Sequence, residues 1–350
     1  MRNRDLLIVT QVIDEQDAVL GFFCGWVRAW AEAFPERKLH VWAWKVGSYS
    51  FPANVSVYQA PDSWVGRAIK LFVYSWRHRQ ALGAVFVHMI PLPAVLLGLW
   101  WKLLGFRIGL WYTHGMVSMT LRLAGWFTDH IFTASAESCR LNTSKKRIVG
   151  HGIDVERFVP HTAIPRMPTI LTVGRISPRK GLTEALDIIA QLAEQPSQAF
   201  QYILVGEPRT ADDEVYALSL RKKVEKLRLQ DRVVWAGAQI GDEVVRTFQS
   251  AAVLLTTSKT GSVDKVVLEA LACGTRVVAL SEVYQAYPGV CGVSSEEEAV
   301  AELSVCLRHP SVNLEAAQYI RTVADQRVLI RRMDKALFAH DANMAFNAKT

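Results

Sequence analysis

Short apolar runs alternate with helical patterns along the whole chain, and this alternation restricts the possible folds more than any other feature. In the first half the strand-like runs are 6–10, 39–45, 55–58, 84–88, 108–112, 130–134 and 147–149. They resume at 170–173, 201–205, 232–236, 253–256 and 276–280. Strands that alternate with helices predict a parallel sheet with helices on both faces. A chain of 350 residues is too long for one ordinary core, so we expect two such α/β domains.

The junction between the two domains is expected near residue 162. The segment 150–168 contains Gly152 and several prolines, and the alternation of strands and helices restarts after it. We therefore predict an N-terminal domain over 1–162 and a C-terminal domain over 163–325. The end of the chain, 318–346, has a basic helical pattern.

Positive charge is concentrated in the first half of the chain. Residues 1–150 hold 17 Lys and Arg against 9 Asp and Glu, whereas the other residues hold 23 against 24. A basic half beside a neutral half indicates an anionic partner, such as a membrane surface or a nucleic acid. We expect no nucleic-acid partner, because the bases are scattered on helices with large apolar residues and no known nucleic-acid motif is present.

Two helical patterns of the first half bear on membrane contact. The segment 64–82 combines Arg and Lys with tryptophans, which fits either a helix in a membrane interface or a core helix with a solvated basic side. The apolar segment 89–101 is interrupted by Pro91 and Pro93 and is too short to span a bilayer, so we predict a buried helix. The N-terminal apolar run is too short for a signal peptide, and we interpret it as the first strand.

The cysteines are widely spaced and odd in number. They are Cys24, Cys139, Cys273, Cys291 and Cys306. Their spacing matches no metal or redox motif, so we expect reduced thiols, a cytoplasmic protein and no metal site.

The most informative loop follows the apolar run 170–173. Gly174 ends that run and is followed by Arg175 and Lys180. Gly181 then opens a helical pattern. A guanidinium can bind phosphate oxygens in a bidentate manner and an ammonium acts as a point charge, so this loop could hold a diphosphate. An ordinary strand-to-helix loop with two solvated bases would have the same sequence pattern.

A second stretch, TGSVDKVVLEALACG at 260–274, favours the diphosphate loop. Together, 174–181 and 269–274 resemble the G-R-x-x-x-x-K-G and E-A-x-A-C-G motifs of the family 4 retaining glycosyltransferases, glycosyl transferases group 1. The resemblance implies the GT-B fold, in which two Rossmann-like, doubly wound parallel-sheet domains face an inter-domain cleft. It further implies an acceptor-side domain over 1–162, a nucleotide-sugar donor domain over 163–325, and a last helix, about 326–350, that packs back on the first domain.

The resemblance also assigns roles to residues of the donor domain. Arg175 and Lys180, with the backbone at Gly174, would stabilise the negative charge that grows on the leaving diphosphate. Glu269 would bind the ribose hydroxyls, with Val266 beside it as a further donor-binding residue. A helix that begins near residue 262 would place Glu269 two turns, roughly 11 Å, from the phosphates.

In the first domain the resemblance indicates His114 and Gly21. His114 follows a strand-like run, where doubly wound sheets bind ligands, and would contact the donor sugar as a third catalytic candidate. His88 lies in a similar place but is a weaker candidate. Gly21 would let the backbone approach the donor phosphate or the acceptor. The carboxylates before it either hold acceptor hydroxyls or belong to a solvated loop; they are Asp14, Glu15 and Asp17.

One position departs from the family pattern. The first glutamate of the E-x7-E motif is replaced by Gly261, and Ser262-Val263-Asp264 replaces the usual G-F-G. Asp264 could read the donor sugar instead, with Gly261 and Ser262 allowing close backbone approach. Asp264 could equally be a favourable acid in the first turn of a helix.

We therefore expect a retaining hexosyltransferase that moves a sugar from a UDP- or GDP-linked donor to a glycan or lipid-linked acceptor. The reaction needs no metal or cofactor, takes place on the cytoplasmic side with an anionic membrane surface as a further partner, and serves cell-surface polysaccharide or glycolipid synthesis. The loss of the first glutamate leaves an alternative, a catalytically silent GT-B subunit or scaffold that binds a nucleotide sugar. A phosphorylase or sugar-nucleotide epimerase ranks last, because no lysine motif for a pyridoxal cofactor is evident.

Overall fold

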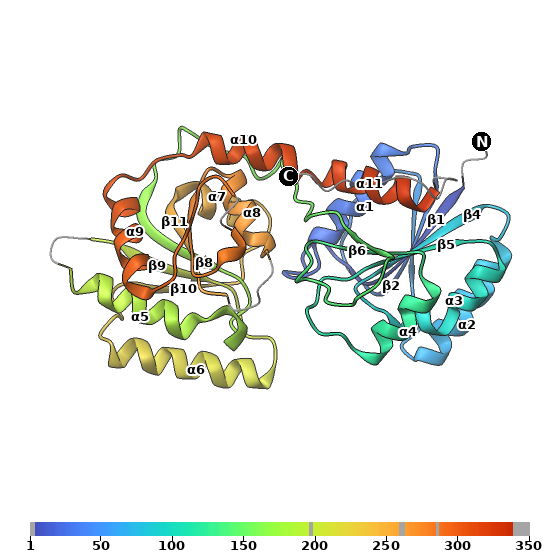
Figure 1. Cartoon of the computed structure of the whole chain (residues 1–350), viewed down its shortest axis with the longest axis horizontal. Coiled ribbons are helices and arrows are strands. Elements are labelled where there is room, and N and C mark those ends of the chain that lie inside the picture. Colours follow the sequence, from blue (N-terminus) through green and yellow to red (C-terminus); the bar gives the residue numbers. More distant parts are fainter. Residues whose placement is uncertain (1–3, 196–198, 259–262, 285–286, 339–350) are drawn as a thin grey trace. The chain divides into compact units, whose positions relative to one another are not determined.

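The structure, a computed structural model, describes residues 4–195, 199–258, 263–284 and 287–338 (Figure 1). The chain forms two compact units. One contains Met1–Gly152 and Gln326–Thr350, and the other contains Ile153–Asp325. Each unit has one parallel sheet between two layers of helices, so the predicted fold class is confirmed.

The first unit contains a seven-stranded sheet in the order β3-β2-β1-β4-β5-β6-β7. Its strands are β1 (Asp5–Ile13), β2 (Leu39–Val46), β3 (Val55–Gln59), β4 (Leu82–His88), β5 (Arg107–Trp111), β6 (His130–Thr133) and β7 (Lys146–Ile148). All seven residues of β4 are buried, as expected for a central strand that helices cover on both faces. Because β1 pairs with both β2 and β4, the order of the strands reverses between β1 and β4.

Two helix layers cover this sheet (Figure 1). On one face α1 (Phe22–Ala33) packs against α11 (Gln326–Phe338). The other face carries α2 (Trp64–Arg77), α3 (Leu92–Leu103) and α4 (Met119–Phe127), with α3 packed between its two neighbours. The C-terminal helix α11 is therefore part of the first unit, and its buried side chains share a core with α1.

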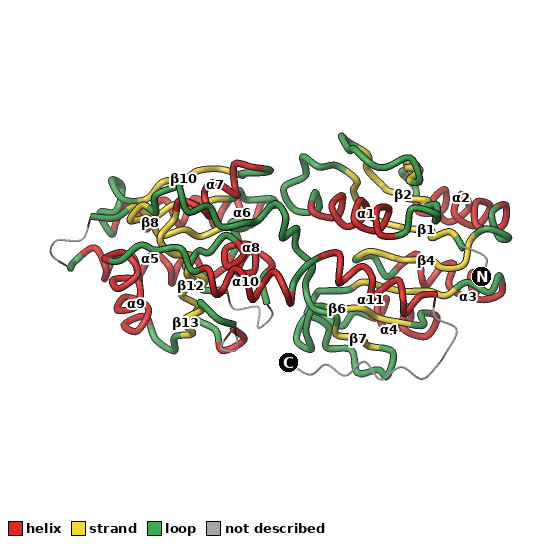
Figure 2. The backbone as a smooth tube through the Cα atoms, turned by 90° about the horizontal axis from the view of Figure 1, so that it is seen from above, coloured by secondary structure: helices red, strands yellow, loops and turns green. Residues whose placement is uncertain are grey.

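The second unit contains a six-stranded sheet in the order β10-β9-β8-β11-β12-β13. Its strands are β8 (Met167–Val173), β9 (Gln201–Val205), β10 (Val233–Gly237), β11 (Ala251–Thr256), β12 (Arg276–Ala279) and β13 (Val290–Gly292). One face carries α5 (Leu182–Ala193), α6 (Ala211–Lys226) and α9 (Glu296–Arg308), and the other carries α7 (Asp242–Ser250), α8 (Lys265–Ala272) and α10 (Leu314–Val323). The elements of each unit can be followed in Figure 2.

The division between the units comes earlier in the chain than residue 162. Ile153 forms a parallel bridge with Asp325, and Val155 and Phe158 are buried in the core of the second unit. These contacts attach the segment after Gly152 to the second unit, although its glycine and prolines are typical of a linker.

The helix predicted over 89–101 is present as α3, but the prediction that it is buried was wrong. Its outward side chains Leu96, Leu99 and Leu103 are 50%, 61% and 73% exposed. The sequence could not distinguish a helix that is buried all round from one with an exposed apolar side, because both have apolar residues on every face. The predicted helix over 64–82 ends at Arg77, and the pattern over 318–346 belongs to two helices, α10 and α11. No helix in the described part of the chain is long and apolar enough to cross a bilayer.

Candidate donor site

The sheet of the second unit brings the loops after β8 and β11 together. The order of the strands reverses between these two neighbours. Ligands of doubly wound sheets bind beyond the carboxyl ends of the strands at such a reversal. The loop after β8 is 174–181, the segment for which the sequence predicted diphosphate binding.

Close backbone contacts hold this loop from two sides. A Cβ on Gly206, at the end of β9, would lie 1.9 Å from the carbonyl oxygen of Gly174. Gly181 has a left-handed φ of 63°, and a Cβ there would lie 2.2 Å from the carbonyl oxygen of Thr257. The Thr257 hydroxyl, just after β11, donates to the carbonyls of Lys180 and Gly181 at 2.9 and 2.7 Å. The glycines allow these approaches, and the loop is fixed to its neighbours on both sides.

Lys180 points to the N-terminus of α8. Its Nζ lies 2.9 Å from Oδ2 of Asp264, and both side chains are largely buried. Asp264 is the N-cap residue of α8, and its amide donates to the Tyr284 hydroxyl at 2.8 Å. An ammonium has three donors, so Lys180 can hold Asp264 and a ligand oxygen together.

Arg175 is held by a residue that the sequence reasoning missed. Its Nε donates to Oδ2 of Asp213 at 2.7 Å, and Nη2 lies 2.5 Å from the same oxygen. The Asp213 side chain is 5% exposed, whereas that of Arg175 is 42% exposed. The carboxylate thus fixes one edge of the guanidinium, and donors on its other edge can reach a ligand.

Asp213 owes its position to the start of α6. Together with Thr210 it forms a capping box, and its carboxylate accepts from the amides of Arg209 and Thr210 at 3.2 Å each. Burial acts to raise the pKa of Asp213, but the hydrogen bonds from Arg175, Arg209 and Thr210 lower it below its usual value. The pattern Thr-x-x-Asp ahead of a helix was the available sequence signal.

Helix α8 begins three residues later than expected. Its first residue is Lys265, so Glu269 lies five residues, about 7.5 Å along the axis, beyond the N-cap rather than two turns. Glu269 pairs with Lys265 at 2.9 Å, which supplies the partner that a carboxylate among apolar neighbours requires. Val266 is half-buried on the same helix. The predictions for Gly261 and Ser262 concern positions outside the described residues.

The two histidines of the first unit lie in different surroundings. His88, at the end of β4, is fully buried, stacks on Phe23 with ring centroids 3.9 Å apart, and lies 3.1 Å from the Thr10 hydroxyl through Nδ1. Burial lowers the pKa of His88 to about 3, so this ring is a neutral core group. His114 is half-exposed in the loop after β5, where its Nδ1 accepts from the Met116 amide at 3.3 Å.

Gly21 lies against its own loop. It is the N-cap residue of α1, and a Cβ there would lie 2.5 Å from the carbonyl oxygen of Asp17. The side chain of Asp17 accepts from the amides of Val19 and Leu20 at 2.9 and 2.8 Å. The need for glycine at this position is therefore explained by packing within the loop.

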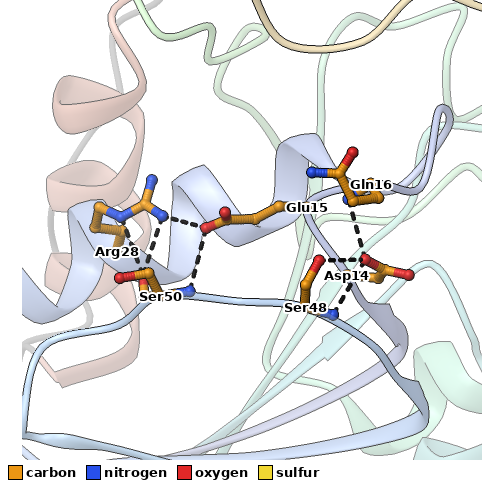
Figure 3. A network of polar contacts seen from close by, with 6 residues as sticks. All are labelled: Asp14, Glu15, Gln16, Arg28, Ser48 and Ser50. Atoms are coloured by element: carbon orange, nitrogen blue, oxygen red, sulfur yellow. Dashed lines mark hydrogen bonds and ion pairs between the residues drawn. The ribbon is translucent and has the colours of Figure 1, made fainter.

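The other two carboxylates of this loop bind the loop after β2 (Figure 3). Asp14 accepts from the amide and hydroxyl of Ser48, and Glu15 accepts from the Ser50 amide and pairs with Arg28. The cluster joins two loops at the carboxyl end of the sheet. Across the described ranges no three His, Cys, Asp or Glu side chains form a group that could hold a metal ion.

Comparison with known proteins finds a family similar to most of the second unit. Residues 155–296 match the sequence profile of the family described as Glycosyl transferases group 1. This segment is thus similar to the glycosyl transferases group 1 domain. It contains the 174–181 loop, Asp213 and α8, which are the parts of the site described above.

The relatives similar in sequence match only part of this chain. The putative colanic acid biosynthesis glycosyltransferase WcaL of Escherichia coli is 32% identical over 135 residues, which are 36% of this chain and 32% of that protein. A D-inositol 3-phosphate glycosyltransferase of Mycobacterium sp. (strain KMS) is 30% identical over 149 residues, 39% of this chain and 32% of that protein. The chain thus spans about a third of the length of these relatives.

Solved structures match nearly the whole chain in fold. Anabaena HepE in complex with UDP and glucose has a TM-score of 0.73 at 15% identity, over 96% of this chain and 100% of that one. WaaG, a glycosyltransferase involved in lipopolysaccharide biosynthesis, has a TM-score of 0.66 at 14% identity, over 95% of this chain and 100% of that one. The two parallel-sheet units of this chain therefore have the GT-B fold.

Proposed function

We propose that this protein is a retaining glycosyltransferase that moves a hexose from a nucleotide-diphosphate sugar to a glycan or lipid-linked acceptor. The observation that carries the proposal is the 174–181 loop at the strand reversal, with Lys180 held at the N-terminus of α8 and Arg175 held at that of α6. The WcaL and WaaG names support a role in cell-surface polysaccharide or glycolipid synthesis. Reduced thiols, four of the five buried, agree with a cytoplasmic site of action.

In this proposal the cations stabilise the leaving group. Negative charge grows on the diphosphate as the bond to the anomeric carbon breaks, so charges fixed there stabilise the transition state more than the ground state. Lys180 would share its ammonium between Asp264 and a phosphate oxygen, and Arg175 would present the edge that Asp213 leaves open. The N-terminus of α8 adds its positive dipole end. This arrangement can act without a metal, which we propose for the reaction.

The nucleoside would lie along α8. Glu269 is our candidate for binding the ribose hydroxyls, with Val266 as a further contact. The expected nucleotide is UDP or GDP, and UDP is the nucleotide in the complex of Anabaena HepE. To meet a ribose, Glu269 must share its carboxylate with Lys265. From the first unit we propose His114 as a contact to the donor sugar.

The cations are tested by matched substitutions in the same unit. Lys180→Ala and Arg175→Ala should each lower kcat about 100-fold or more in a transfer assay with UDP- or GDP-hexose. Lys223→Ala and Arg157→Ala are the controls, because these side chains have similar exposure and also pair with a carboxylate. Equal activity of all four variants would contradict the proposed roles of Lys180 and Arg175. Loss of the wild-type activity on addition of a metal chelator would contradict a reaction that needs no metal.

Asp264 is proposed to read the donor sugar in place of the missing glutamate. If so, Asp264→Asn should weaken binding of the UDP-sugar and leave the affinity for UDP unchanged, as measured by ligand-induced thermal stabilisation. Equal weakening of both ligands would assign Asp264 to the positioning of Lys180 instead.

A silent nucleotide-sugar-binding subunit is the second candidate, favoured by Gly261 at the position of that glutamate. Such a protein would be stabilised by UDP or GDP but would neither transfer nor hydrolyse the sugar of the donor. Purified protein incubated with labelled donor, with and without acceptor extracts, distinguishes the two functions.

A further inference from the structure

The outer surface of the α2, α3 and α4 layer exposes a set of large apolar side chains. On α2 they are Trp64, Val65, Ile69, Phe72 and Trp76; on α3 they are Leu96, Leu99 and Leu103; on α4 they are Met119 and Trp126, with Met116 just before it. They are between 40% and 74% exposed. A scatter of single apolar residues is normal on a protein surface, but three adjacent helices that each present an apolar stripe form a patch that requires a partner.

The stripes on α2 and α3 are continuous. The half-buried Trp100 of α3 stacks on Phe72 of α2 with ring centroids 4.2 Å apart, and lies 5.5 Å from the ring of Trp76. Helix α3 packs between α2 and α4, and the three helices form one layer in Figure 1. We call this surface the outer helix face and define it by the exposed residues named above.

The charges on these helices all have one sign. Together α2, α3 and α4 contain Arg67, Lys70, Arg77, Lys102 and Arg122, and their sequences contain no Asp or Glu. Arg79, just after α2, lies over the ring of Trp76 at 4.1 Å. Lys102 pairs with Asp129 in the loop beyond α4, and Lys70, Arg77 and Arg122 are exposed on the same helices. The face is therefore both apolar and cationic.

We propose that the outer helix face binds the interface of an anionic lipid bilayer. Leucine, isoleucine and tryptophan side chains insert at the boundary between headgroups and acyl chains, and lysine and arginine bind the anionic headgroups. A second copy of the chain fits less well, because a symmetric interface would place these cations opposite one another. A nucleic acid would pair with the cations but would leave the aliphatic stripes without a partner. The proposal uses no residue of the donor site and goes beyond the transfer reaction.

The first arm of the test is vesicle flotation with the full chain. The protein should float with vesicles of phosphatidylcholine and phosphatidylglycerol in equal parts, bind vesicles of phosphatidylcholine alone much more weakly, and dissociate from the anionic vesicles in high salt. Failure to bind anionic vesicles at low salt overturns the proposal. Equal binding to both vesicle types overturns its electrostatic part.

The second arm uses matched pairs of exposed residues. Leu99→Ser with Leu103→Ser should weaken binding to anionic vesicles about tenfold or more, because two inserted side chains are lost. Val215→Ser with Leu218→Ser on α6 is the control, since these residues are 68% and 60% exposed, close to the 61% and 73% of the leucines. Equal affinities of the two double variants for the vesicles would contradict the proposal. It would also be contradicted if the wild-type protein were a dimer and only the leucine double variant were a monomer, because the face would then bind a second copy of the chain.

The third arm tests the charges. Lys70→Gln and Arg122→Gln should each weaken binding to anionic vesicles about fivefold at low salt, whereas Lys222→Gln, an exposed residue of α6, should leave it unchanged. All variants should keep the wild-type melting temperature, because the substituted side chains lie at the surface. UDP should still stabilise all of these variants against thermal unfolding. A failure of the membrane proposal can therefore be distinguished from a failure of the proposed transfer function.

Discussion

At the scale of single residues, the candidate donor site depends on two tightly constrained positions, Gly181 and Asp213. Gly181 combines a left-handed backbone with a carbonyl oxygen 2.2 Å from where its Cβ would be. Asp213 combines nearly complete burial with an arginine partner and two backbone donors. Both residues fix the 174–181 loop in place, Gly181 by its close approach to Thr257 and Asp213 by its ion pair with Arg175.

Gly181→Ala should destabilise the second unit more than Gly105→Ala destabilises the first. Both glycines have positive φ, which costs alanine about 1–2 kcal/mol, but nothing lies within 4 Å of a Cβ at Gly105. The clash with Thr257 should add about 1–3 kcal/mol. Urea unfolding measures both changes, and equal losses would show that the loop moves freely away from Thr257.

His88 should make the first unit less stable in acid. Its pKa is about 3 in the folded protein because of burial, and the unfolded chain has the ordinary value of about 6.5. As the pH falls through 6.5 the unfolded chain binds a proton that the folded chain does not, so the free energy of unfolding falls, by on the order of 4 kcal/mol at pH 3.

The measurement is the pH dependence of unfolding of His88→Gln between pH 6.5 and 3. This variant should show a shallower loss of stability than wild type, and the exposed His309→Gln should not. Parallel curves for all three proteins would mean that His88 takes up its proton in the folded state.

At the scale of elements, helix termini connect stability with the site. The capping box of α6 holds Thr210 and Asp213, and Asp213 in turn holds Arg175. The N-terminus of α8 faces Lys180 through Asp264. Both helices thus position a cation of the 174–181 loop by residues at their N-termini. A change at either helix terminus should therefore affect both stability and the loop.

Thr210→Ala should therefore affect two properties. Loss of the cap should cost about 1 kcal/mol, and the looser Asp213 should lower kcat of the proposed transfer by several-fold through Arg175. Ser295→Ala is the control, because Ser295 caps α9 in the same way, by accepting from the Glu298 amide at 3.2 Å. It should cost similar stability and leave the transfer rate unchanged. If both variants lose activity equally, Asp213 has no positioning role.

At the scale of the whole molecule, the chain leaves the first unit after Gly152 and re-enters it at Gln326. Helix α11 is joined to the first unit by Asp334, which is 4% exposed, accepts from Nε1 of Trp30 at 2.8 Å and forms an ion pair with Arg37. The first unit is therefore complete only when the last helix is present.

Asp334→Asn should destabilise the first unit by about 3–5 kcal/mol, because it leaves Arg37 buried without its countercharge. Hydrogen exchange should show lost protection in α1 and α11, with the second unit unchanged. Glu156→Gln removes an exposed ion pair with Arg321 and should cost no more than about 1 kcal/mol. Equal loss of protection in both units would show that they unfold as one.

Much of this protein could be predicted from local sequence. The alternation of strand and helix patterns predicted both sheets, because the period of apolar residues reports which face of each element is buried. The motif at 174–181 predicted a diphosphate loop from two glycines and two cations of one segment, and the structure places this loop at the strand reversal, while its binding of a donor stays a prediction.

Only the tertiary structure decided the contacts between distant segments. Asp213 reaches Arg175 across 38 residues, Lys265 pairs with Glu269, and the outward leucines of α3 are exposed. Apolar periodicity shows that a face is hydrophobic but not what covers it, and a polar partner is chosen by the fold that brings it within hydrogen-bond distance. The division after Gly152 was decided in the same way, by the core that Val155 and Phe158 enter.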